Sequence, residues 1–261
     1  MELKNNTILI TGGTSGIGLE LATRLLGLGN TVIVTGRDQG KLDQVHRLLP
    51  GVHTLQSDVR DPEAIRLLYQ QITKQYPALN ILINNAAEMR RLDLHDPLLD
   101  VYNITREVEI NLSGPIRMVQ QFLPLLRGKK NAAILNVTSG IALATFPLSP
   151  VYSATKSGLR AFTKALRVQV KRDGIRVFDL VAPGARTPLN DKFKNDVNPR
   201  MLMDAGKLAD DAIRGLESDK WEIYPGIAKV IRFMSRLAPG MLFGQMSKIA
   251  ERALEPVQGG R

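Results

Sequence analysis

Short apolar runs recur along the chain, and each is separated from the next by a longer stretch with the hydrophobic spacing of a helix. Six runs are rich in Val, Ile and Leu on both faces, as in parallel strands that are covered on both sides. They occupy residues 7–11, 31–36, 52–57, 79–84, 132–139 and 175–183, and a weaker seventh lies at 221–224. The pattern predicts seven strands.

The segments between these runs are amphipathic and long enough for helices. They cover residues 16–28, 38–48, 61–76, 104–127 and 153–172. Asp61 followed by Pro62 is typical of a helix start, because aspartate caps the helix and proline fits its first turn. Pro115 and Pro124 are expected to bend or interrupt the long helix at 104–127.

The alternation of strands and helices predicts an α/β fold. We expect a three-layer, doubly wound parallel sheet of the Rossmann type, with right-handed crossovers. The chain of 261 residues suits one large domain, and no repeat, low-complexity tract or linker marks a second one. The sequence therefore predicts a single domain.

Composition excludes several classes of function. With 44% hydrophobic and 23% charged residues, the chain is typical of a globular protein. It has no apolar run of about 18 residues that would span a membrane, and the early first strand leaves no room for a signal peptide. The absence of cysteine excludes disulfides and thiol catalysis, and His46, His53 and His95 lack metal-ligand spacing. We expect a cytoplasmic protein without a metal.

The formal net charge is +10, and much of it lies between Lys156 and Arg200, a segment that contains eleven Lys and Arg but only four Asp. A basic surface can attract nucleic acid, anionic lipid or a phosphorylated ligand. No aromatic-interleaved basic patch and no nucleic-acid motif accompany these charges. We interpret the excess as a solvated face, part of which serves an anionic cofactor or substrate.

A glycine-rich stretch, TGGTSGIG at 11–18, follows the first strand and opens the first helix. Gly12, Gly16 and Gly18 allow a sharp turn, the approach of a pyrophosphate to the helix N-terminus, and close packing of helix on strand. The alternative is a tight turn that binds no ligand. The position of the glycine-rich stretch in a βαβ unit favours a dinucleotide site.

The end of the second strand predicts which dinucleotide binds. An NAD site usually has a carboxylate there to bond the ribose hydroxyls. This chain has Gly36 and Arg37 instead, and a guanidinium pairs well with a 2′-phosphate. We interpret Asp38 as the cap of the next helix. NADP(H) is therefore favoured, with NAD(H), and a merely solvated Arg37, as alternatives.

These motifs, together with those that follow them, resemble the classical short-chain dehydrogenases/reductases over about residues 5–225. The resemblance rests on TGGTSGIG, Asp58-Val59, NNAA at 84–87, Asn111, Ser139, YSATK at 152–156 and Pro183-Gly184, in that order. Ala87 departs from the usual glycine and can shift the backbone beside the nicotinamide. NNTILITGG and MSRLAPG further resemble the DltE-type oxidoreductases of that family.

The resemblance implies roles for individual residues. Asp58 and Val59 would hold the adenine, and Asn85 would fix the sheet beside the cofactor. The cofactor-binding set would be Gly12, Thr14, Ser15, Gly16, Ile17, Gly18, Arg37, Asp58, Val59, Asn85, Ala86, Tyr152, Lys156, Pro183, Gly184 and Thr187. The catalytic set would be Asn111, Ser139, Tyr152 and Lys156.

The residue types suit that chemistry. Tyr152 and Lys156 are four residues apart, so they share one helix face, and a cation near a phenol favours its ionised form. A phenol tuned in this way can exchange a proton with a substrate oxygen. Ser139 ends the fifth strand and can donate to the same oxygen. Asn111 can order a water near Lys156 or satisfy buried backbone groups, and the two roles are compatible.

The substrate is less clearly indicated. The apolar loop 141–148 favours a hydrophobic carbonyl or alcohol, whereas Arg186, Lys192 and Lys194 favour an acidic one. We expect a Rossmann-type binding and catalytic domain at 1–225 with a substrate lid at about 185–215. A C-terminal extension, 226–261, is apolar and basic. It can cover the cleft or contact a subunit, and a peripheral membrane contact is the less favoured alternative.

The sequence thus predicts an NADP(H)-dependent oxidoreductase that interconverts a carbonyl and a secondary alcohol. Its partner would be a small molecule and not nucleic acid, and we expect a homodimer or homotetramer. One alternative is an NAD(H)-dependent dehydrogenase of the same fold. Another is a catalytically idle nucleotide-sensing or cell-envelope accessory protein, against which the presence of Ser139, Tyr152 and Lys156 argues.

Overall fold

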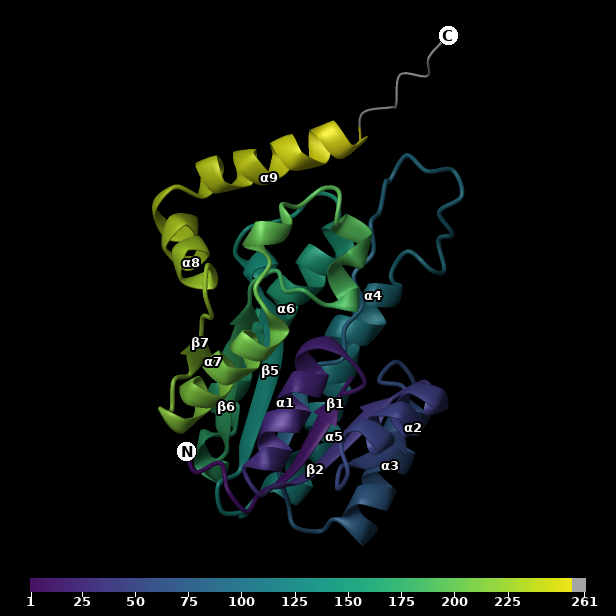
Figure 1. Cartoon of the computed structure of the whole chain (residues 1–261), viewed down its shortest axis with the longest axis vertical. Helices are drawn as coiled ribbons and strands as arrows, with labels where there is room; N and C mark the ends of the chain where they lie inside the picture. The colour runs from purple at the N-terminus through teal and green to yellow at the C-terminus, as the bar shows by residue number, and fades with distance from the viewer. Residues whose placement is uncertain (255–261) are drawn as a thin grey trace.

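A parallel sheet of seven strands forms the centre of the molecule in the computed structural model, which describes residues 1–254 (Figure 1). The strand order is β3-β2-β1-β4-β5-β6-β7. The strands are β1 (Thr7–Thr11), β2 (Thr31–Gly36), β3 (His53–Gln56), β4 (Leu79–Asn84), β5 (Ala133–Ser139), β6 (Arg176–Ala182) and β7 (Glu222–Ile223). The predicted doubly wound α/β fold is confirmed.

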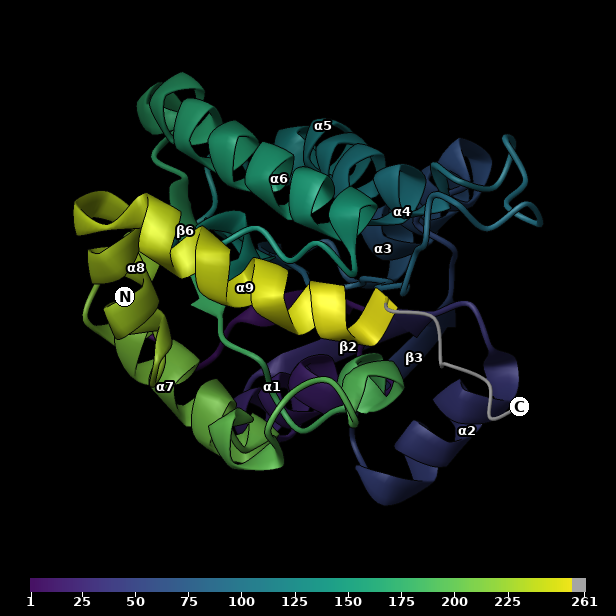
Figure 2. The same ribbon diagram turned by 90° about the horizontal axis from the view of Figure 1, so that it is seen from above.

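Helices cover both faces of the sheet and make three layers (Figure 2). On one face lie α1 (Gly16–Gly27), α2 (Gln39–Leu48) and α7 (Ala205–Glu217), and on the other α3 (Pro62–Gln75), α5 (Gly114–Leu126) and α6 (Pro150–Gln169). Each face of the sheet has its own apolar core beneath the helices. Successive strand side chains alternate between these two cores, so that Ile8 and Ile10 join one and Leu9 joins the other. This alternation explains why the inner strands are apolar on both faces. β3 lies at the edge of the sheet and contains no buried residue, so the expected burial on both faces is wrong for this strand.

Local signals at the helix starts act as expected. The Asp38 side chain accepts a hydrogen bond from the backbone N–H of Lys41, and Asp61 accepts one from Glu63. Each caps its helix, which confirms both assignments. Pro62 occupies the first turn of α3, where its missing N–H leaves no bond unmade.

The long helix expected at 104–127 has three parts. α4 (Arg106–Val108) leads into a π-helical turn at Glu109–Ser113, and α5 follows. Pro115 lies just after the π-helical turn, so the interruption falls where a proline was expected to cause one. Pro124 lies inside α5, which continues to Leu126.

Residues 185–254 contain more helix than the sequence pattern indicated. Two short 3₁₀ turns, Pro188–Phe193 and Pro199–Met201, precede α7. α7 was not predicted, yet Leu208, Ala209, Ala212 and Leu216 bury one of its faces in the core shared with α1. Thus the last third of the expected lid, residues 205–215, belongs to the helix layer that covers the sheet.

Two C-terminal helices, α8 (Ala228–Leu237) and α9 (Pro239–Leu254), complete the described chain. Figure 2 shows α9 lying across the top of the molecule, between the helix layers that flank the sheet. The remainder of the expected extension, 255–261, lies outside the described residues. Among residues 1–254, no helix combines the length and apolar character needed to cross a membrane.

Candidate active site

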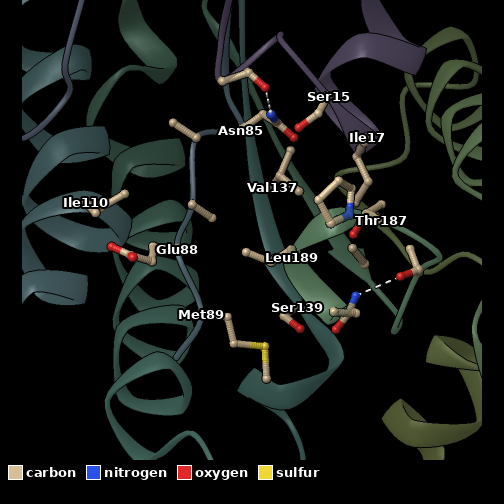
Figure 3. Close-up of a pocket in the computed structure, with 18 of the residues that line it drawn as sticks. Ser15, Ile17, Asn85, Glu88, Met89, Ile110, Val137, Ser139, Thr187 and Leu189 are labelled. Atoms are coloured by element: carbon tan, nitrogen blue, oxygen red, sulfur yellow. Dashed lines mark hydrogen bonds between the residues drawn. The ribbon is translucent and has the colours of Figure 1, made fainter. Parts of the chain in front are cut away.

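A cavity of about 420 Å³ opens at the carboxyl ends of the strands. Its walls come from the segments that follow β1, β2, β3, β4, β5 and β6. The cavity thus spans the point between β1 and β4 at which the strand order of a doubly wound sheet reverses. Figure 3 shows Ser15, Ile17 and Asn85 toward one end of the cavity and Ser139, Met89 and Leu189 toward the other. Sequence segments far apart in the chain therefore share one site.

The glycine loop leaves room for a ligand at the start of α1. Gly12 and Gly16 have φ angles of 66° and 53°, which side-chain-bearing residues rarely adopt. A Cβ on Gly18 would lie 2.4 Å from both the Asn85 Nδ2 atom and the Gly12 carbonyl oxygen. The Ser15 side chain does not cap α1, so the first N–H groups of that helix face the cavity without a side-chain acceptor. These features fit a dinucleotide pyrophosphate.

Asn85 fixes this loop against the sheet. Its Nδ2 atom donates to the carbonyl oxygens of Thr11 and Gly12, at 3.0 and 2.9 Å. The Thr11 hydroxyl in turn accepts hydrogen bonds from the backbone N–H groups of Asn85 and Ala86. The segments after β1 and β4 are thereby held together at the bottom of the cavity.

Cations gather where β2 ends. Arg37 and Lys41 are both exposed and both line the cavity. A Cβ on Gly36 would stand 2.8 Å from the Thr14 Cγ2 atom, so a carboxylate side chain at position 36 would require the loop to shift. The end of β2 therefore presents positive charge without an adjacent carboxylate on that strand.

Asp58 lies beside these cations. Arg60 pairs with its carboxylate at 2.6 Å, and the Arg60 backbone N–H donates to it at 2.9 Å. Burial alone would raise the pKa of Asp58, but the hydrogen bonds from Arg60 and the charge of Arg37 outweigh it and lower that pKa. Asp58 is thus an ionised acceptor at the cavity wall.

Ser139, Tyr152 and Lys156 line the opposite end of the cavity. All three are buried, with exposures of 7%, 5% and 2%. The Lys156 Nζ atom lies 5.6 Å from the centre of the Tyr152 ring and donates to the Val137 carbonyl oxygen at 2.8 Å. The helix spacing of Tyr152 and Lys156 and the end of β5 bring the three polar groups together.

Burial shifts the pKa values of this pair in opposite directions. It raises the pKa of the Tyr152 phenol, while the Ser139 hydroxyl acts the other way. Burial lowers the pKa of Lys156 to about 8, and the charge of Asp179 limits that drop. At pH 7 the phenol is therefore protonated and the lysine carries its charge.

Asn111 is fully buried in the π-helical turn and is not among the residues that line the cavity. Its Oδ1 atom accepts from the Glu88 N–H at 2.8 Å, and its Nδ2 atom donates to the Glu88 carbonyl and to the Thr155 hydroxyl. Asn111 thus ties the segment after β4 to α6, which matches the backbone-satisfying role considered for it.

A buried ionic network lies behind Lys156. The Thr138 hydroxyl donates to Asp179 at 2.5 Å, and the Arg160 Nε atom lies 3.6 Å from the other carboxylate oxygen. Arg160 also bonds Glu222 and the Tyr224 hydroxyl. Burial raises the pKa of Asp179 to about 6 despite these partners. The network connects α6 with β6 and β7.

An apolar cluster covers the Tyr152 side of the site. It contains Met89, Phe146, Leu148, Tyr152, Phe193 and Ala250, with Met246 and Ile249 packed against it. Phe146 and Phe193 meet edge to face, with ring centres 5.6 Å apart. Helix α9 therefore covers the space next to the phenol with apolar side chains.

The structure brings most of the predicted site residues together around one cavity. Gly18 and Asn111 do not line it, but each packs against or bonds a segment that does. Sequence reasoning missed Lys41, whose only signal is its place one turn after Arg37. It also missed Asp179, which is a single charged residue within an apolar strand and belongs to no motif. Within the described part of the chain, no three His, Cys, Asp or Glu side chains gather to hold a metal ion.

Comparisons with known proteins give one consistent result. The family model described as short chain dehydrogenase matches residues 6–198. The uncharacterized oxidoreductase DltE of Bacillus subtilis is 37% identical over 251 residues, which cover 95% of this chain and 98% of that relative.

Solved structures share the fold. A short chain dehydrogenase from Burkholderia cenocepacia in complex with NADP has a TM-score of 0.81 at 23% identity, covering 94% of this chain and 99% of that one. A short chain dehydrogenase/reductase from Burkholderia phymatum in complex with NAD has a TM-score of 0.77 at 20% identity, covering 89% and 93%.

Proposed function

The chain belongs to the short-chain dehydrogenase/reductase family and is an NAD(P)-dependent oxidoreductase, and from this premise we propose that it uses NADP(H) to interconvert a hydrophobic carbonyl compound and a secondary alcohol. The observation that carries the proposal is the single cavity shared by the glycine loop, Arg37, Ser139, Tyr152 and Lys156. Cofactor and substrate can therefore meet at the buried phenol.

When bound, the nicotinamide cofactor supplies or accepts the hydride. The side chains of this protein handle the proton. In the reducing direction the Tyr152 phenol donates its proton to the substrate oxygen, while the Ser139 hydroxyl donates a hydrogen bond to the same atom. The positive charge of Lys156, on the same helix face, favours the phenolate that remains.

Asn111 positions this set without touching the substrate. Its amide holds the backbone at Glu88, and that segment lines the cavity. The same amide bonds Thr155, which lies beside Lys156 on α6. We propose that Asn111 keeps the segment after β4 in register with the catalytic helix.

The choice of NADP(H) rests on the end of β2. Arg37 and Lys41 would pair with a 2′-phosphate, and Gly36 leaves no carboxylate to repel it. The two Burkholderia structures contain NADP and NAD, so the fold accepts both cofactors and the residues at this strand end decide. The other proposed contacts are those of the glycine loop, of Asp58-Val59 with adenine, and of Pro183, Gly184 and Thr187 near the nicotinamide.

The proposed substrate is hydrophobic because its end of the cavity is lined by Met89, Ile141 and Leu189. Lys192 also lines the cavity, so an acidic group on the substrate would meet one cation there. A set of apolar ketones and aldehydes, each with and without a carboxylate, would separate these two contributions.

Cofactor titration tests the proposal most directly. We expect the purified protein to bind NADPH tightly and NADH weakly, as followed by the fluorescence of the reduced nicotinamide. Arg37→Asp should weaken NADPH binding by about tenfold or more and change NADH binding far less, because it removes a charge-assisted pair worth roughly 1.5–3 kcal/mol.

Arg172→Asp is the matched control, because this substitution changes the net charge by the same amount. Arg172 is exposed in the turn before β6, at the edge of the sheet away from the cavity. It should leave both affinities nearly unchanged. Equal loss of NADPH and NADH binding in Arg37→Asp would overturn the cofactor assignment. Binding of neither cofactor by the unaltered protein would overturn the proposed function itself.

A further inference from the structure

Helix α8 turns its apolar face to solvent. Val230, Phe233 and Leu237 follow helical spacing and are 57%, 62% and 67% exposed. Only Ala228 is buried within this helix. An amphipathic surface helix normally buries its apolar stripe against the core, so this orientation is the reverse of the usual one.

The inward side of α8 makes both apolar and polar contacts, since Ala228 joins Val181 and Tyr224 in a small buried cluster and Ile231 lies against Gly140. The Arg232 guanidinium stacks on the Tyr224 ring at 4.5 Å and lies 3.9 Å from Glu222. Glu222 and Tyr224 in turn bond Arg160 of α6. The ionic network behind Lys156 therefore fixes the orientation of α8 and keeps its apolar stripe outward.

Neighbouring helix α9 shows the usual arrangement. Its apolar residues Leu242, Met246, Ile249 and Ala250 face the protein, where the last three join the cluster over Tyr152. Large apolar side chains remain exposed at its two ends, where Met241 and Phe243 are 54% and 50% accessible and Leu254 is 40% accessible. We call the exposed apolar residues of α8 and of the start of α9, namely Val230, Phe233, Leu237, Met241 and Phe243, the outer stripe.

The charged residues that adjoin the outer stripe in the sequence are all basic. Residues 225–247 contain Lys229, Arg232 and Arg236 and no Asp or Glu, whereas Lys248 of α9 is followed by the exposed Glu251. Lys229 and Arg236 are exposed beside the stripe on α8, and Lys248 is exposed on α9. An apolar stripe bordered by cations on a helix is the pattern of a helix that lies in the surface of an anionic bilayer.

We propose that the outer stripe and its flanking cations dock this protein on an anionic lipid surface. A second copy of the chain is a poor occupant, because a two-fold contact through this face would bring the Lys229 and Arg236 charges of both copies into one interface without a carboxylate from α8 to pair with them. A folded protein partner needs roughly 800 Å² of complementary surface on each side, whereas α8 offers three large apolar side chains on ten residues. A bilayer requires neither shape complementarity nor a large area.

Docking in this way would place lipid beside α9, which covers the apolar end of the cavity. A substrate that partitions into the bilayer would then be concentrated near the site. The lipid contact itself is independent of the proposed reaction, because the outer stripe contains no residue of the cavity wall.

Vesicle sedimentation of the full chain, without cofactor or substrate, tests the proposal. The protein should pellet with vesicles of phosphatidylcholine containing phosphatidylglycerol, and much less with phosphatidylcholine alone. The double variant Phe233→Ser/Leu237→Ser should reduce the pelleted fraction by about tenfold. Lys229→Glu/Arg236→Glu should do the same, and added salt should weaken binding of the unaltered protein.

Leu67→Ser/Val168→Ser is the matched control, because these apolar residues are 47% and 75% exposed on α3 and α6. It should pellet like the unaltered protein, and circular dichroism and melting temperature verify that every variant is folded. No pelleting with anionic vesicles, or equal pelleting with neutral ones, would overturn the proposal. So would a dimer in sedimentation equilibrium that Leu237→Ser dissociates, or capture by an acidic protein without vesicle binding.

Discussion

Tyr152 and Lys156 form a buried pair whose ionisation is set by their surroundings. Burial raises the pKa of the phenol and lowers that of the ammonium to about 8. The raised pKa keeps the phenol neutral at pH 7, and the lysine stays charged there because its lowered pKa of about 8 still lies above 7. A neutral acid beside a cation can donate a proton to a developing alkoxide. Burial is the main cause of both pKa shifts, and the helix spacing together with the end of β5 brings the groups side by side.

Replacing Tyr152 by Phe should abolish turnover while leaving NADPH affinity within a few-fold. Phenylalanine keeps the packing with Phe146 and Met89 and removes only the hydroxyl. The loss should exceed about 10²-fold in kcat, the lower range for a positioned acid. Steady-state kinetics and cofactor titration on the same preparation check both halves, and retained turnover would contradict the assignment of Tyr152.

Replacing Lys156 by Met should stabilise the protein in the absence of cofactor. The folded pKa of Lys156 is about 8, below its ordinary 10.5, so the folded state binds this proton less tightly than the unfolded state does. The penalty is fully present below pH 8, and stability recovers as pH rises from 8 to about 10.5. Allowing for the Val137 carbonyl left unpaired, the gain at pH 7 should be on the order of 1–3 kcal/mol.

Thermal unfolding at several pH values measures this effect. The variant should melt several degrees higher than the unaltered protein at pH 7, and the difference should shrink as pH approaches 10. A lower melting temperature at pH 7 would show that the ammonium is well compensated. Turnover should be lost in either case, so stability and activity change in opposite directions.

At the scale of elements, helix α9 connects the C-terminal extension to the site. Met246 and Ile249 pack on the cluster that includes Tyr152, Phe146 and Phe193. They are partly buried, so the helix is held by a limited apolar contact and not by the main core. An element with few buried apolar contacts opens more readily than the sheet does.

Met246→Ala/Ile249→Ala should therefore loosen α9 without unfolding the sheet. Hydrogen exchange should accelerate at 239–254 by about tenfold or more, since truncating partly buried apolar side chains costs roughly 1–2 kcal/mol each. Exchange in β1 and β4 should stay unchanged. Met241→Ala, on the exposed side of the same helix, is the control. Faster exchange throughout the protein would instead place α9 in the main cooperative unit.

At the scale of the whole molecule, the dinucleotide cavity joins the two halves of the sheet. Its walls come from strands on both sides of the switch between β1 and β4. A ligand that contacts both halves should stabilise the entire domain, by about 2.7 kcal/mol at one hundred times its Kd. The melting temperature in the presence of cofactor therefore reports on an intact cavity.

Gly18→Ala and Gly27→Ala, both in α1, form a matched pair for this measurement. A methyl group on Gly18 would stand 2.4 Å from the Asn85 side chain and the Gly12 carbonyl, whereas nothing lies within 4 Å of the same group on Gly27. Gly18→Ala should lose most of the thermal shift produced by NADPH. Gly27→Ala should keep it and melt slightly higher, because alanine favours a helix by roughly 0.5–1 kcal/mol. Equal shifts in both variants would contradict the packing role of Gly18.

Sequence alone determined the parts of this protein that depend on local periodicity and backbone geometry. Neighbouring residues are enough to predict the apolar strands, the glycines that allow positive φ at 12 and 16, and the helix caps at Asp38 and Asp61. Strand-helix alternation with right-handed crossovers then leaves few arrangements for the sheet. That is why the fold and the ends of the strands could be predicted.

Only the tertiary structure decided which surfaces these elements share. Helical spacing shows that α8 and α9 each have an apolar face, but the contacts of Arg232 with Tyr224 and Glu222 turn one face outward, and the cluster around Phe146 buries the other. Asp179 joins Arg160 through a fold that brings β6 next to α6. These outcomes depend on contacts between distant segments, whose energies are set by packing and burial and leave no periodic trace in the sequence.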